Sequence, residues 1–482
     1  MYKYLRPLAI FSVIIIFLLA LLAALTYRER MLLLDPAWIG FNIINNGTFS
    51  FAEFRYGAFI SQMFPLIASS LGLSLKTVLI SYSLSFYLFY LATALILTFR
   101  FRQYWLTILL GLYLTVFASD VFYWPNNELH QGIAWMLLFI GLFRSAGTLK
   151  AGTHILLVLL LALAVCSHLI VAIPLVFLWV YTRSAPDFPP EKRRSFIIYS
   201  VLIAVMIFIR YQLSSGPSYD GMKLHGVQKA SLLRAIESFS SGQSRTFLEL
   251  LRTIHWVAIP LAIASLALLV VKRKYFHLVI TLGAVLGYYA LVCLVYPDAY
   301  DRNLRFYMES EWQALVLIIA TPLCCIPLAT PLSRRVLTYG IASVMLIKGA
   351  YILRSYSFFH ERYERLAHIC EQLRNAHIYK AIIVAPPAEA DNHFIMSWGL
   401  PVESILYSVL AGYDTAVTFK VADENAGLEQ PPAGKFHSCF GVLSPYRDLN
   451  ARYFNLDTAG QYHIIYGLDS LLRREDGKSM AD

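Results

Sequence analysis

Residues Leu32–Tyr56 read LLLDPAWIGFNIINNGTFSFAEFRY, a polar loop that separates two long apolar parts of the chain. The loop carries Asp35 directly after the first hydrophobic segment, and Glu53 and Arg55 near its end. We expect a charged loop held against a bilayer surface to be where chemistry takes place. The rest of the chain then serves as the scaffold that holds this loop at the membrane face.

The composition predicts a helical membrane protein. Of the 482 residues, 58% are hydrophobic and 15% are charged, and the mean hydropathy is +0.58. Soluble domains have roughly 45–50% apolar and about 25% charged residues. The excess apolar residues form continuous runs of about 20 residues, the length that crosses a bilayer as a helix. Strands of a transmembrane barrel would alternate apolar and polar residues instead.

The net charge of +10 does not indicate a nucleic-acid-binding protein. Before Arg354 the basic residues concentrate in short clusters at alternate loops, as the positive-inside rule predicts for cytoplasmic loops. Of the acidic residues in this part, only Asp187 and Glu191 fall in the same loops. We therefore expect membrane lipids as partners, and no nucleic acid.

Hydropathy and loop charge together predict about eleven transmembrane spans, with the N-terminus cytoplasmic and the C-terminal part outside. The first run, 7–27, favours an uncleaved anchor over a signal peptide because it is long. The uncharged run 151–182 has basic residues on both sides, so we expect a hairpin with its tip near Ser167–His168. The segment 57–73 is predicted to be a helix in the membrane interface.

The predicted organisation has two parts. Residues 1–354 form the transmembrane domain, with outer loops at 28–75, 120–131, 214–253 and 297–311, of which 214–253 is expected to form amphipathic helices on the membrane surface. Residues 355–482 form a small soluble α/β domain outside the membrane. Its expected helices cover 360–376 and 400–412, the second capped by Gly412, and its expected strands lie in 379–387, 415–422, 437–443 and 462–468.

The cysteines do not suggest a metal site, because no pair has the spacing of metal ligands. Four of the six Cys lie in apolar runs and are expected to be buried hydrophobic residues. For Cys370 and Cys439 two alternatives are open, a disulfide in an oxidising compartment or two buried thiols.

Charged side chains gather in the predicted outer loops: Asp35, Glu53, Arg55, Asp120, Glu128, His130, Arg302, Arg305, Glu309 and Glu311. Each also has a purely structural interpretation. Most loop charges are only solvated, Asp35–Pro36 has the residues of a helix start, and Arg302 and Arg305 are typical interfacial anchors. His168 is then an ordinary polar residue at a hairpin tip.

A functional interpretation combines three elements on this one face. A carboxylate near the bilayer surface suits a general base that takes a proton from an acceptor. Arginines at headgroup level suit the phosphate of a lipid-linked donor. Interfacial helices suit a groove for its lipid chain.

The layout resembles that of the GT-C glycosyltransferase superfamily. The resemblance lies in a first span, an outer loop with an early acid, interfacial helices and a second acidic loop after the third span, and it covers the chain to about Leu213. It implies that Asp35 is the first-loop catalytic acid and that Glu128 is the second, with Asp120 as the alternative. The later stretch DRNLRFYMESEW resembles an Arg–Tyr stretch of these enzymes, which implies a donor-phosphate ligand at Arg302 or Arg305.

The leading hypothesis is therefore transfer of a sugar from a polyprenyl-phosphate donor to an acceptor on the outer face of a membrane, expected to be a bacterial inner membrane with the C-terminal domain in the periplasm. Asp35 is the expected general base and Glu128 the second catalytic residue. The expected substrate-binding residues are Glu53, Arg55, His130, His168, Arg302 and Arg305. Asp35 lacks a paired acid nearby, so the loop gives no support for a divalent metal, and no other cofactor is expected.

Two alternatives remain open. One is a transporter or lipid flippase, which would need ionisable residues near the middle of the bilayer. Arg144, Arg210 and Lys348 lie near predicted span ends, where their charges can reach the surface. The other is a non-catalytic scaffold of the same architecture, whose outer domain binds a partner.

Overall fold

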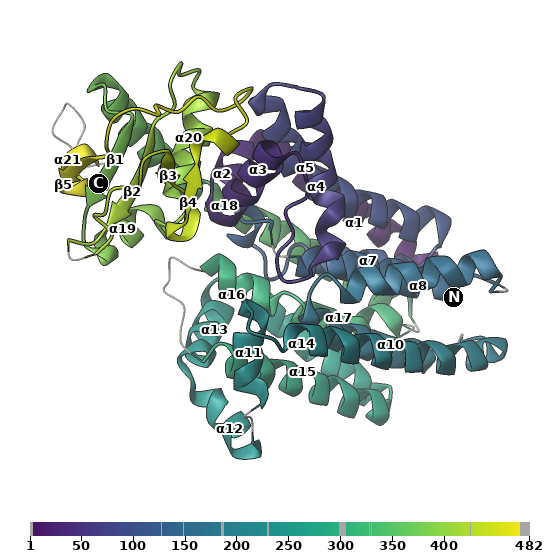
Figure 1. Ribbon diagram of the computed structural model, residues 1–482. Coiled ribbons are helices and arrows are strands. Elements are labelled where there is room, and N and C mark those ends of the chain that lie inside the picture. The colour runs from purple at the N-terminus through teal and green to yellow at the C-terminus, as the bar shows by residue number, and fades with distance from the viewer. Residues whose placement is uncertain are drawn as a thin grey trace.

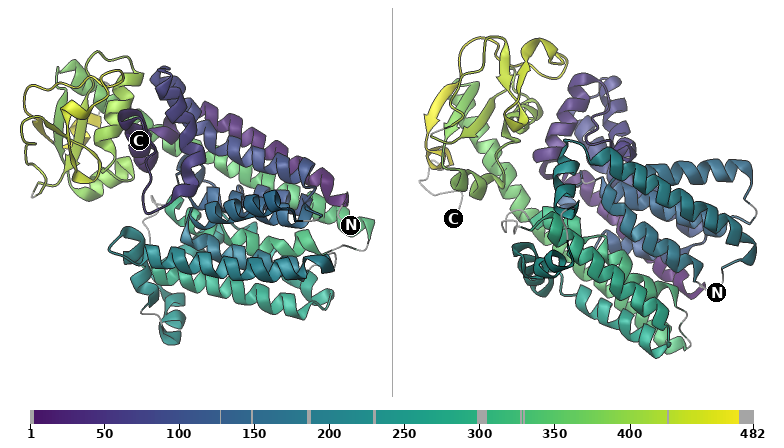
Figure 2. Two further views of the ribbon diagram at one scale, coloured as in Figure 1. Left: turned by 45° about the vertical axis from the view of Figure 1, so that its right-hand side comes forward. Right: turned by 60° about the horizontal axis from the view of Figure 1, so that its bottom comes forward.

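The computed structural model describes residues 3–472 except residues 127, 148, 185–187, 229–230, 298–304, 327, 329 and 425. The chain forms a bundle of roughly aligned helices with a small α/β domain at one end (Figure 1). The N-terminus lies at the opposite end of the bundle from this domain, as both turned views also show (Figure 2).

The bundle is built from apolar helices that pack side by side. Its helices are α1 (Arg6–Leu25), α5 (Leu75–Leu95), α6 (Tyr104–Tyr113), α7 (Leu129–Ser145), α8 (Ala151–Val165), α9 (Ala172–Arg183), α10 (Arg193–Ser214), α14 (Ala258–Val271), α15 (Tyr275–Val295) and α17 (Leu315–Cys325), together with the first part of α18 (Pro331–Asn375). Helix α1 lies between α5 and α6, and α17 lies against α6, α14 and α15. Nearly every residue of α6 and α17 is buried, so these two helices form the centre of the bundle.

Five helical segments are long and apolar enough to cross a membrane: 6–25, 75–100, 190–214, 275–295 and the apolar part of 331–375. A sixth is added if α13 (Gly242–Thr253) and α14, which meet at 92°, count as one bent span. Four other predicted spans are shorter apolar helices, at 104–113, 151–165, 169–183 and 315–325. Length and composition therefore support a helical membrane protein.

The run 151–182 is divided into two helices near Ser167–His168, where the tip of a hairpin was predicted. Helix α8 ends at Val165, and the chain re-enters helical structure at η5 (Leu169–Val171), which leads into α9. His168 has an extended backbone at this break, and its Nδ1 accepts a hydrogen bond from the Ile170 N–H at 3.2 Å. The imidazole thus caps η5, at the start of the second helical part of this run.

Short helices fill the predicted outer loops and gather at the end of the bundle that faces the α/β domain (Figures 1 and 2). They are α2 (Tyr27–Met31), α3 (Leu34–Asn46), α4 (Phe59–Ser70), α11 (Tyr219–Gln228), α12 (Leu232–Glu237), α13 and α16 (Arg305–Trp312). Segment 57–73 is helical as predicted, and α4 packs along α5. The prediction that loop 214–253 is helical is confirmed by α11, α12 and α13.

Helix α18 joins the two parts of the molecule without a break. Its 45 residues run from the bundle into the α/β domain, a length of roughly 67 Å at 1.5 Å per residue. The predicted domain boundary between residues 354 and 355 therefore falls inside one continuous helix. The apolar span and the soluble helix predicted after it share this helix, because nothing between them breaks helical backbone geometry.

The α/β domain contains a three-stranded parallel sheet in the order β2–β1–β5. Its strands are β1 (Lys380–Val384), β2 (Thr418–Ala422) and β5 (His463–Tyr466), and β3 (Lys435–His437) pairs separately with β4 (Leu443–Pro445). The helices are α19 (Pro387–Phe394), α20 (Leu400–Leu410) and α21 (Leu468–Leu472), with the end of α18. β1, β2 and β5 confirm three of the predicted strands, and β1 is buried along its whole length, as a central parallel strand should be. The strand predicted at 437–443 is wrong, because this segment is the turn between β3 and β4 and contains the 3-10 helix η9 (Cys439–Gly441).

Two details of this domain also bear on sequence predictions. Gly412 follows α20 with φ +75°, the left-handed backbone that favours glycine after a helix end. Cys370 and Cys439 are both buried and form no disulfide. Of the two alternatives, the structure therefore shows two buried thiols.

Candidate functional site

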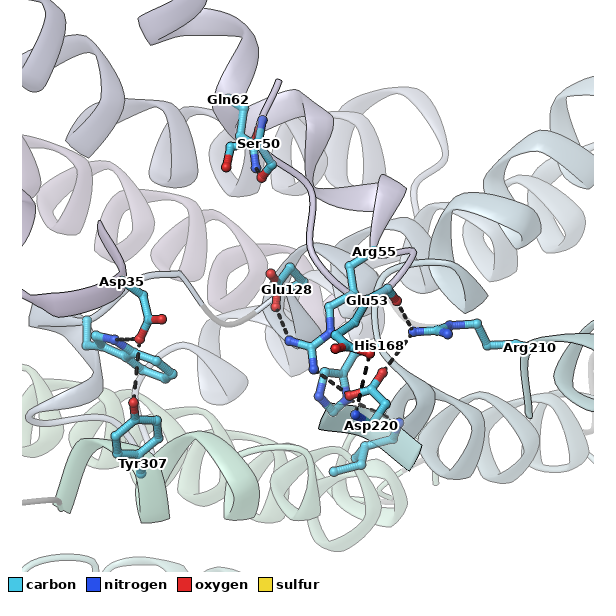
Figure 3. Close-up of polar contacts among 12 residues, drawn as sticks. Asp35, Ser50, Glu53, Arg55, Gln62, Glu128, His168, Arg210, Asp220 and Tyr307 are labelled. Carbon is cyan, nitrogen blue, oxygen red and sulfur yellow. Dashed lines mark hydrogen bonds and ion pairs between the residues drawn. The ribbon is translucent and has the colours of Figure 1, made fainter. Parts of the chain in front are cut away.

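Asp35 lies in the first turn of α3, at the end of the bundle that faces the α/β domain. The structural interpretation of Asp35–Pro36 in the sequence takes Asp35 as the cap of this helix and Pro36 as its first residue. The cap position is instead Leu33, and helix α3 begins at Leu34, so this prediction is wrong by two positions. Oδ2 of Asp35 accepts a hydrogen bond from Trp124 Nε1 at 3.0 Å (Figure 3).

The second donor to the Asp35 carboxylate is also neutral. Tyr307 of α16 donates its hydroxyl to the same Oδ2 at 3.5 Å, and its ring lies 4.6 Å from the Trp124 ring. No described Lys or Arg side chain forms an ion pair with Asp35. Burial raises the pKa of Asp35 to about 6, partly opposed by the Trp124 hydrogen bond and reinforced by the nearby Glu128 charge.

Arg55 is the centre of a second group of charges on the same face (Figure 3). Its Nη1 lies 2.8 Å from Glu128 Oε2, and its Nη2 lies 2.7 Å from Asp220 Oδ1. The other oxygen of Asp220, Oδ2, lies 3.1 Å from Nη2 of Arg210. We call Arg55, Glu128, Arg210 and Asp220 the arginine cluster. Two cations thus alternate with two carboxylates, at side-chain exposures of 2–15%.

The Arg55 loop reaches the cluster through a tight backbone path. Glu53 and Phe54 both have positive φ, 53° and 56°, which is strained for residues other than glycine. Ser50 and Gln62 close the loop with two mutual hydrogen bonds of 2.8 Å (Figure 3). Gly57 then passes so close to the hairpin tip that a Cβ there would lie 1.9 Å from Ser167 Oγ.

The charges of the cluster shift the proton affinities of its members. Burial alone would raise the pKa of Asp220, but the charge and hydrogen bond of Arg55, together with smaller contributions from His168 and Arg210, outweigh burial and lower that pKa. The pKa of His168, at the hairpin tip beside them, falls to about 3 because of burial and the charge of Arg55. Asp220 is therefore a carboxylate and His168 a neutral imidazole at neutral pH.

A largely apolar cavity of about 580 Å³ adjoins the arginine cluster. Asp220 and His168 belong to its lining, so the cluster and the cavity share a wall. Most of the other lining residues are aliphatic or aromatic: Leu169, Ile170, Ala172, Ile173, Ala204, Ile207, Phe208, Tyr211, Leu224, Val227, Leu291, Val295 and Tyr296. Its volume lies within the range of small-molecule sites, which are about 300–1,000 Å³.

Lys223 is the one lysine in the cavity lining. Its Nζ lies 4.5 Å from the centre of the Tyr296 ring and 5.4 Å from that of Tyr219. Among the described residues, no carboxylate forms an ion pair with this ammonium, although its charge acts through space on the buried Glu311. Lys223 thus differs from Arg55 and Arg210, whose charges are neutralised by carboxylates.

Asp120 and Arg305 belong to a separate network of hydrogen bonds. Nε of Arg305 lies 2.6 Å from Asp120 Oδ2, and Ser355 of α18 donates to Asp120 Oδ1 at 2.6 Å. Glu309 accepts backbone N–H bonds from Ser119 and Val121 at 2.9 and 2.8 Å. The network therefore fixes the loop that ends in Trp124, and it places Arg305 with Asp120 instead of with the arginine cluster.

The structure brings together only part of the predicted site. Arg55 and Glu128 are bonded to each other, and Glu53 accepts the Tyr219 N–H at 3.0 Å. His130 is buried in the bundle, where its Nδ1 lies 2.7 Å from the Tyr113 hydroxyl. Arg302 lies outside the described residues.

The prediction that Arg210 and Lys348 reach the membrane surface is wrong. Arg210 is buried and turned into the arginine cluster, and Lys348 is fully buried with its Nζ 3.0 Å from His255 Nδ1. Both charges are bonded within the bundle because the facing loops supply partners that hydropathy does not reveal.

Asp220, Lys223, Tyr307 and Trp124 belong to the site but were not predicted. A signal for Asp220 existed, since it is an acidic residue in a predicted outer loop that follows Arg210 closely in sequence. For the other three, only the fold brings α11, α16 and the loop before α7 to the same place. No group of three or more His, Cys, Asp or Glu suited to a metal ion occurs in the described parts of the chain.

Comparison with known protein families, with characterised proteins and with solved structures finds no match to this chain.

Proposed function

We propose that this protein is a membrane glycosyltransferase that moves a sugar from a polyprenyl-phosphate donor to an acceptor on the outer face of a membrane. The proposal includes about eleven spans, a cytoplasmic N-terminus and an α/β domain on the outer side, in the periplasm if the membrane is a bacterial inner membrane. The apolar helices support the membrane part, and the segregation of loop charges supports the orientation.

The observation that carries the proposal is the environment of Asp35. This carboxylate has only neutral donors among the described residues, and burial holds its pKa at about 6. At neutral pH most of it is ionised, yet it binds a proton more readily than an ordinary aspartate, which suits a general base near its working pH.

The reaction follows from these groups. An acceptor hydroxyl attacks the anomeric carbon of the sugar while Asp35 takes the hydroxyl proton. The bond between that carbon and the phosphate oxygen breaks, and polyprenyl phosphate leaves with the electron pair. No redox partner is required, and the proton passes from Asp35 to water.

The cavity beside the arginine cluster supports a lipid-linked donor. Its apolar lining suits an isoprenoid chain, and Lys223 supplies a positive charge without a described carboxylate partner. We therefore propose Lys223 as the first phosphate ligand, in place of Arg305, which is paired with Asp120. Arg55 contributes at the other side of the shared wall, where a phosphate would compete with Glu128.

The test is Asp35→Asn in purified protein, assayed by release of polyprenyl phosphate from a panel of synthetic polyprenyl-phosphate hexoses. Loss of the base should lower turnover by about 10²- to 10⁴-fold. Asp448→Asn is the matched control, because that side chain is 61% exposed on the α/β domain. Wild-type turnover by Asp35→Asn, or no turnover of any donor by the wild type, rejects the proposal.

A further inference from the structure

The backbone directly before Asp35 has an unusual conformation. Leu32, Leu33 and Leu34 are all buried, and Leu34 has φ +44°, in the left-handed region that leucine rarely adopts. Helix α3 begins at this residue, so the direction in which Asp35 projects depends on this turn. A leucine stays in such a conformation only where its surroundings hold it there.

Two side chains of the α/β domain hold the turn. Glu403 of α20 accepts the Leu34 N–H through Oε1 at 2.7 Å. Arg362 of α18 donates from Nη1 to the Leu32 carbonyl at 3.1 Å. The two side chains also pair with each other, Arg362 Nη2 to Glu403 Oε2 at 2.7 Å, with exposures of 3% and 0%.

The fit around this pair is close. Arg362 Nε donates to the Phe394 carbonyl at 2.8 Å, which fixes the guanidinium plane. A Cβ added at Gly399 would lie 2.4 Å from Glu403 Oε1 and 3.1 Å from the Leu34 Cα. Gly399 is thus required for α20 to approach α3, which lies beside it (Figure 1).

The location of the hydrogen-bond donors to Asp35 makes this turn important. Trp124 and Tyr307 belong to other segments of the chain, and both bond to the same oxygen of Asp35. The carboxylate meets both of them only if the start of α3 stays where the turn places it. Neither donor can compensate for a displaced backbone, because each is packed against the other.

We infer that the Arg362–Glu403 pair is a positioning device, through which the α/β domain holds the base Asp35 in its reactive orientation. The inference rests on the proposed function, since it takes Asp35 as the base. It assigns a role to the C-terminal domain beyond packing, and it makes Arg362 and Glu403 positioning residues that do not touch the substrate.

The first readout needs no substrate. Hydrogen exchange over residues 32–38 should become at least about tenfold faster in Glu403→Ala, because the Leu34 N–H loses its acceptor, while β1 stays protected. The fluorescence of Trp124 can be isolated by subtracting the signal of Trp124→Phe, and its change with pH reports the titration of Asp35. In the wild type the midpoint of this change should lie near pH 6. In Glu403→Ala the midpoint should fall towards the usual aspartate range, because a loosened Asp35 becomes better solvated.

The second readout is catalysis. Displacement of a reacting group by about 1 Å costs roughly 10²-fold in rate, so kcat of Glu403→Ala should fall by about that factor with the donor KM unchanged. Glu403→Gln keeps the shape of the side chain and an oxygen that can accept the Leu34 N–H. It is the variant to use if Glu403→Ala does not fold, and its kcat should fall less than that of the alanine variant. Glu371→Gln is the matched control, since Glu371 accepts the Tyr407 hydroxyl at 3.0 Å within the domain.

The outcomes separate the two proposals. If Glu403→Ala and Glu403→Gln keep the wild-type kcat and titration midpoint, the positioning role is rejected while Asp35 remains the base. If Asp35→Asn keeps wild-type turnover, the proposed function itself is rejected. If Glu371→Gln impairs kcat as much as Glu403→Gln does, the effect is one of domain stability and the positioning role is again rejected.

Discussion

Asp35 and the arginine cluster lie on the same face of the molecule, but their carboxylates have opposite kinds of hydrogen-bond partner. Asp35 is bonded by an indole and a phenol, whereas Glu128 and Asp220 are bonded by guanidiniums. The pKa of Asp35 is therefore raised to about 6 by burial, and the pKa of Asp220 is lowered by its arginines. Of these two aspartates, only Asp35 is suited to exchange a proton near neutral pH.

The difference shows why charge at a site does not by itself indicate catalysis. The arginine cluster holds the Arg55 loop, the second acidic loop and α11 together, so its charges stabilise the architecture. Asp35 contributes little to that architecture through ion pairs. The partners of a carboxylate thus decide whether its pKa is raised, as for Asp35, or lowered, as for Asp220.

The largest expected effect is on stability and would come from the arginine cluster. Arg55→Ala removes one ion pair from Glu128 and one from Asp220, and breaking a buried pair typically costs about 3–5 kcal/mol. We expect a loss of about 3 kcal/mol in the free energy of unfolding, measured by denaturant titration in detergent. The double variant Arg55→Ala with Glu128→Ala should recover part of the lost free energy of unfolding. If the double variant is as unstable as Arg55→Ala, the broken ion pair is not the cause of the loss.

The pH dependence of turnover should be governed by Asp35. Because the base must be deprotonated, the rate should fall about tenfold per pH unit below pH 6 and reach a plateau above pH 7. Asp220 does not interfere in this window. Its folded-state pKa is depressed below the usual aspartate value, so the stability it contributes is present above that usual value and is lost only as the pH falls through the depressed one. A rate that is constant from pH 5 to 8 contradicts the assignment of Asp35.

Lys223→Gln should weaken donor binding and leave the chemical step nearly unchanged. A charge-assisted contact to phosphate is worth about 1.5–3 kcal/mol, so the donor KM should rise by roughly tenfold or more. Lys76→Gln, an exposed lysine at the start of α5, is the control and should leave KM unaltered. An unchanged KM in Lys223→Gln, with a raised KM in Arg305→Gln, would return the phosphate site to Arg305.

The smallest expected effect is that of Trp124→Phe. The indole hydrogen bond lowers the pKa of Asp35, so its removal should move the midpoint of the pH–rate profile upwards. A hydrogen bond to a charged group is worth about 1.5–3 kcal/mol, part of which water replaces, so we expect a shift of roughly one pH unit or less. A downward shift would mean that Trp124 does not stabilise the ionised form.

Local sequence patterns were sufficient for most of the secondary structure. The break in the run 151–182, the helix ending before Gly412 and the buried strand at 380–384 follow from flanking charge, glycine and apolar continuity, all of which act over a few residues. The presence of Asp35, Arg55 and Glu128 in one region was likewise predictable, because loop charge decides which loops share a face of the bundle.

Pairing between distant segments was decided by the tertiary structure alone. Arg55 meets Asp220 across 165 residues, and Leu34 meets Glu403 across 369. The same packing buried His130 against Tyr113 and turned Arg210 inwards. No local pattern carries this information, because a hydrogen-bond partner is chosen by where the backbone brings two groups together, and so the proton affinity of Asp35 is a property of the fold.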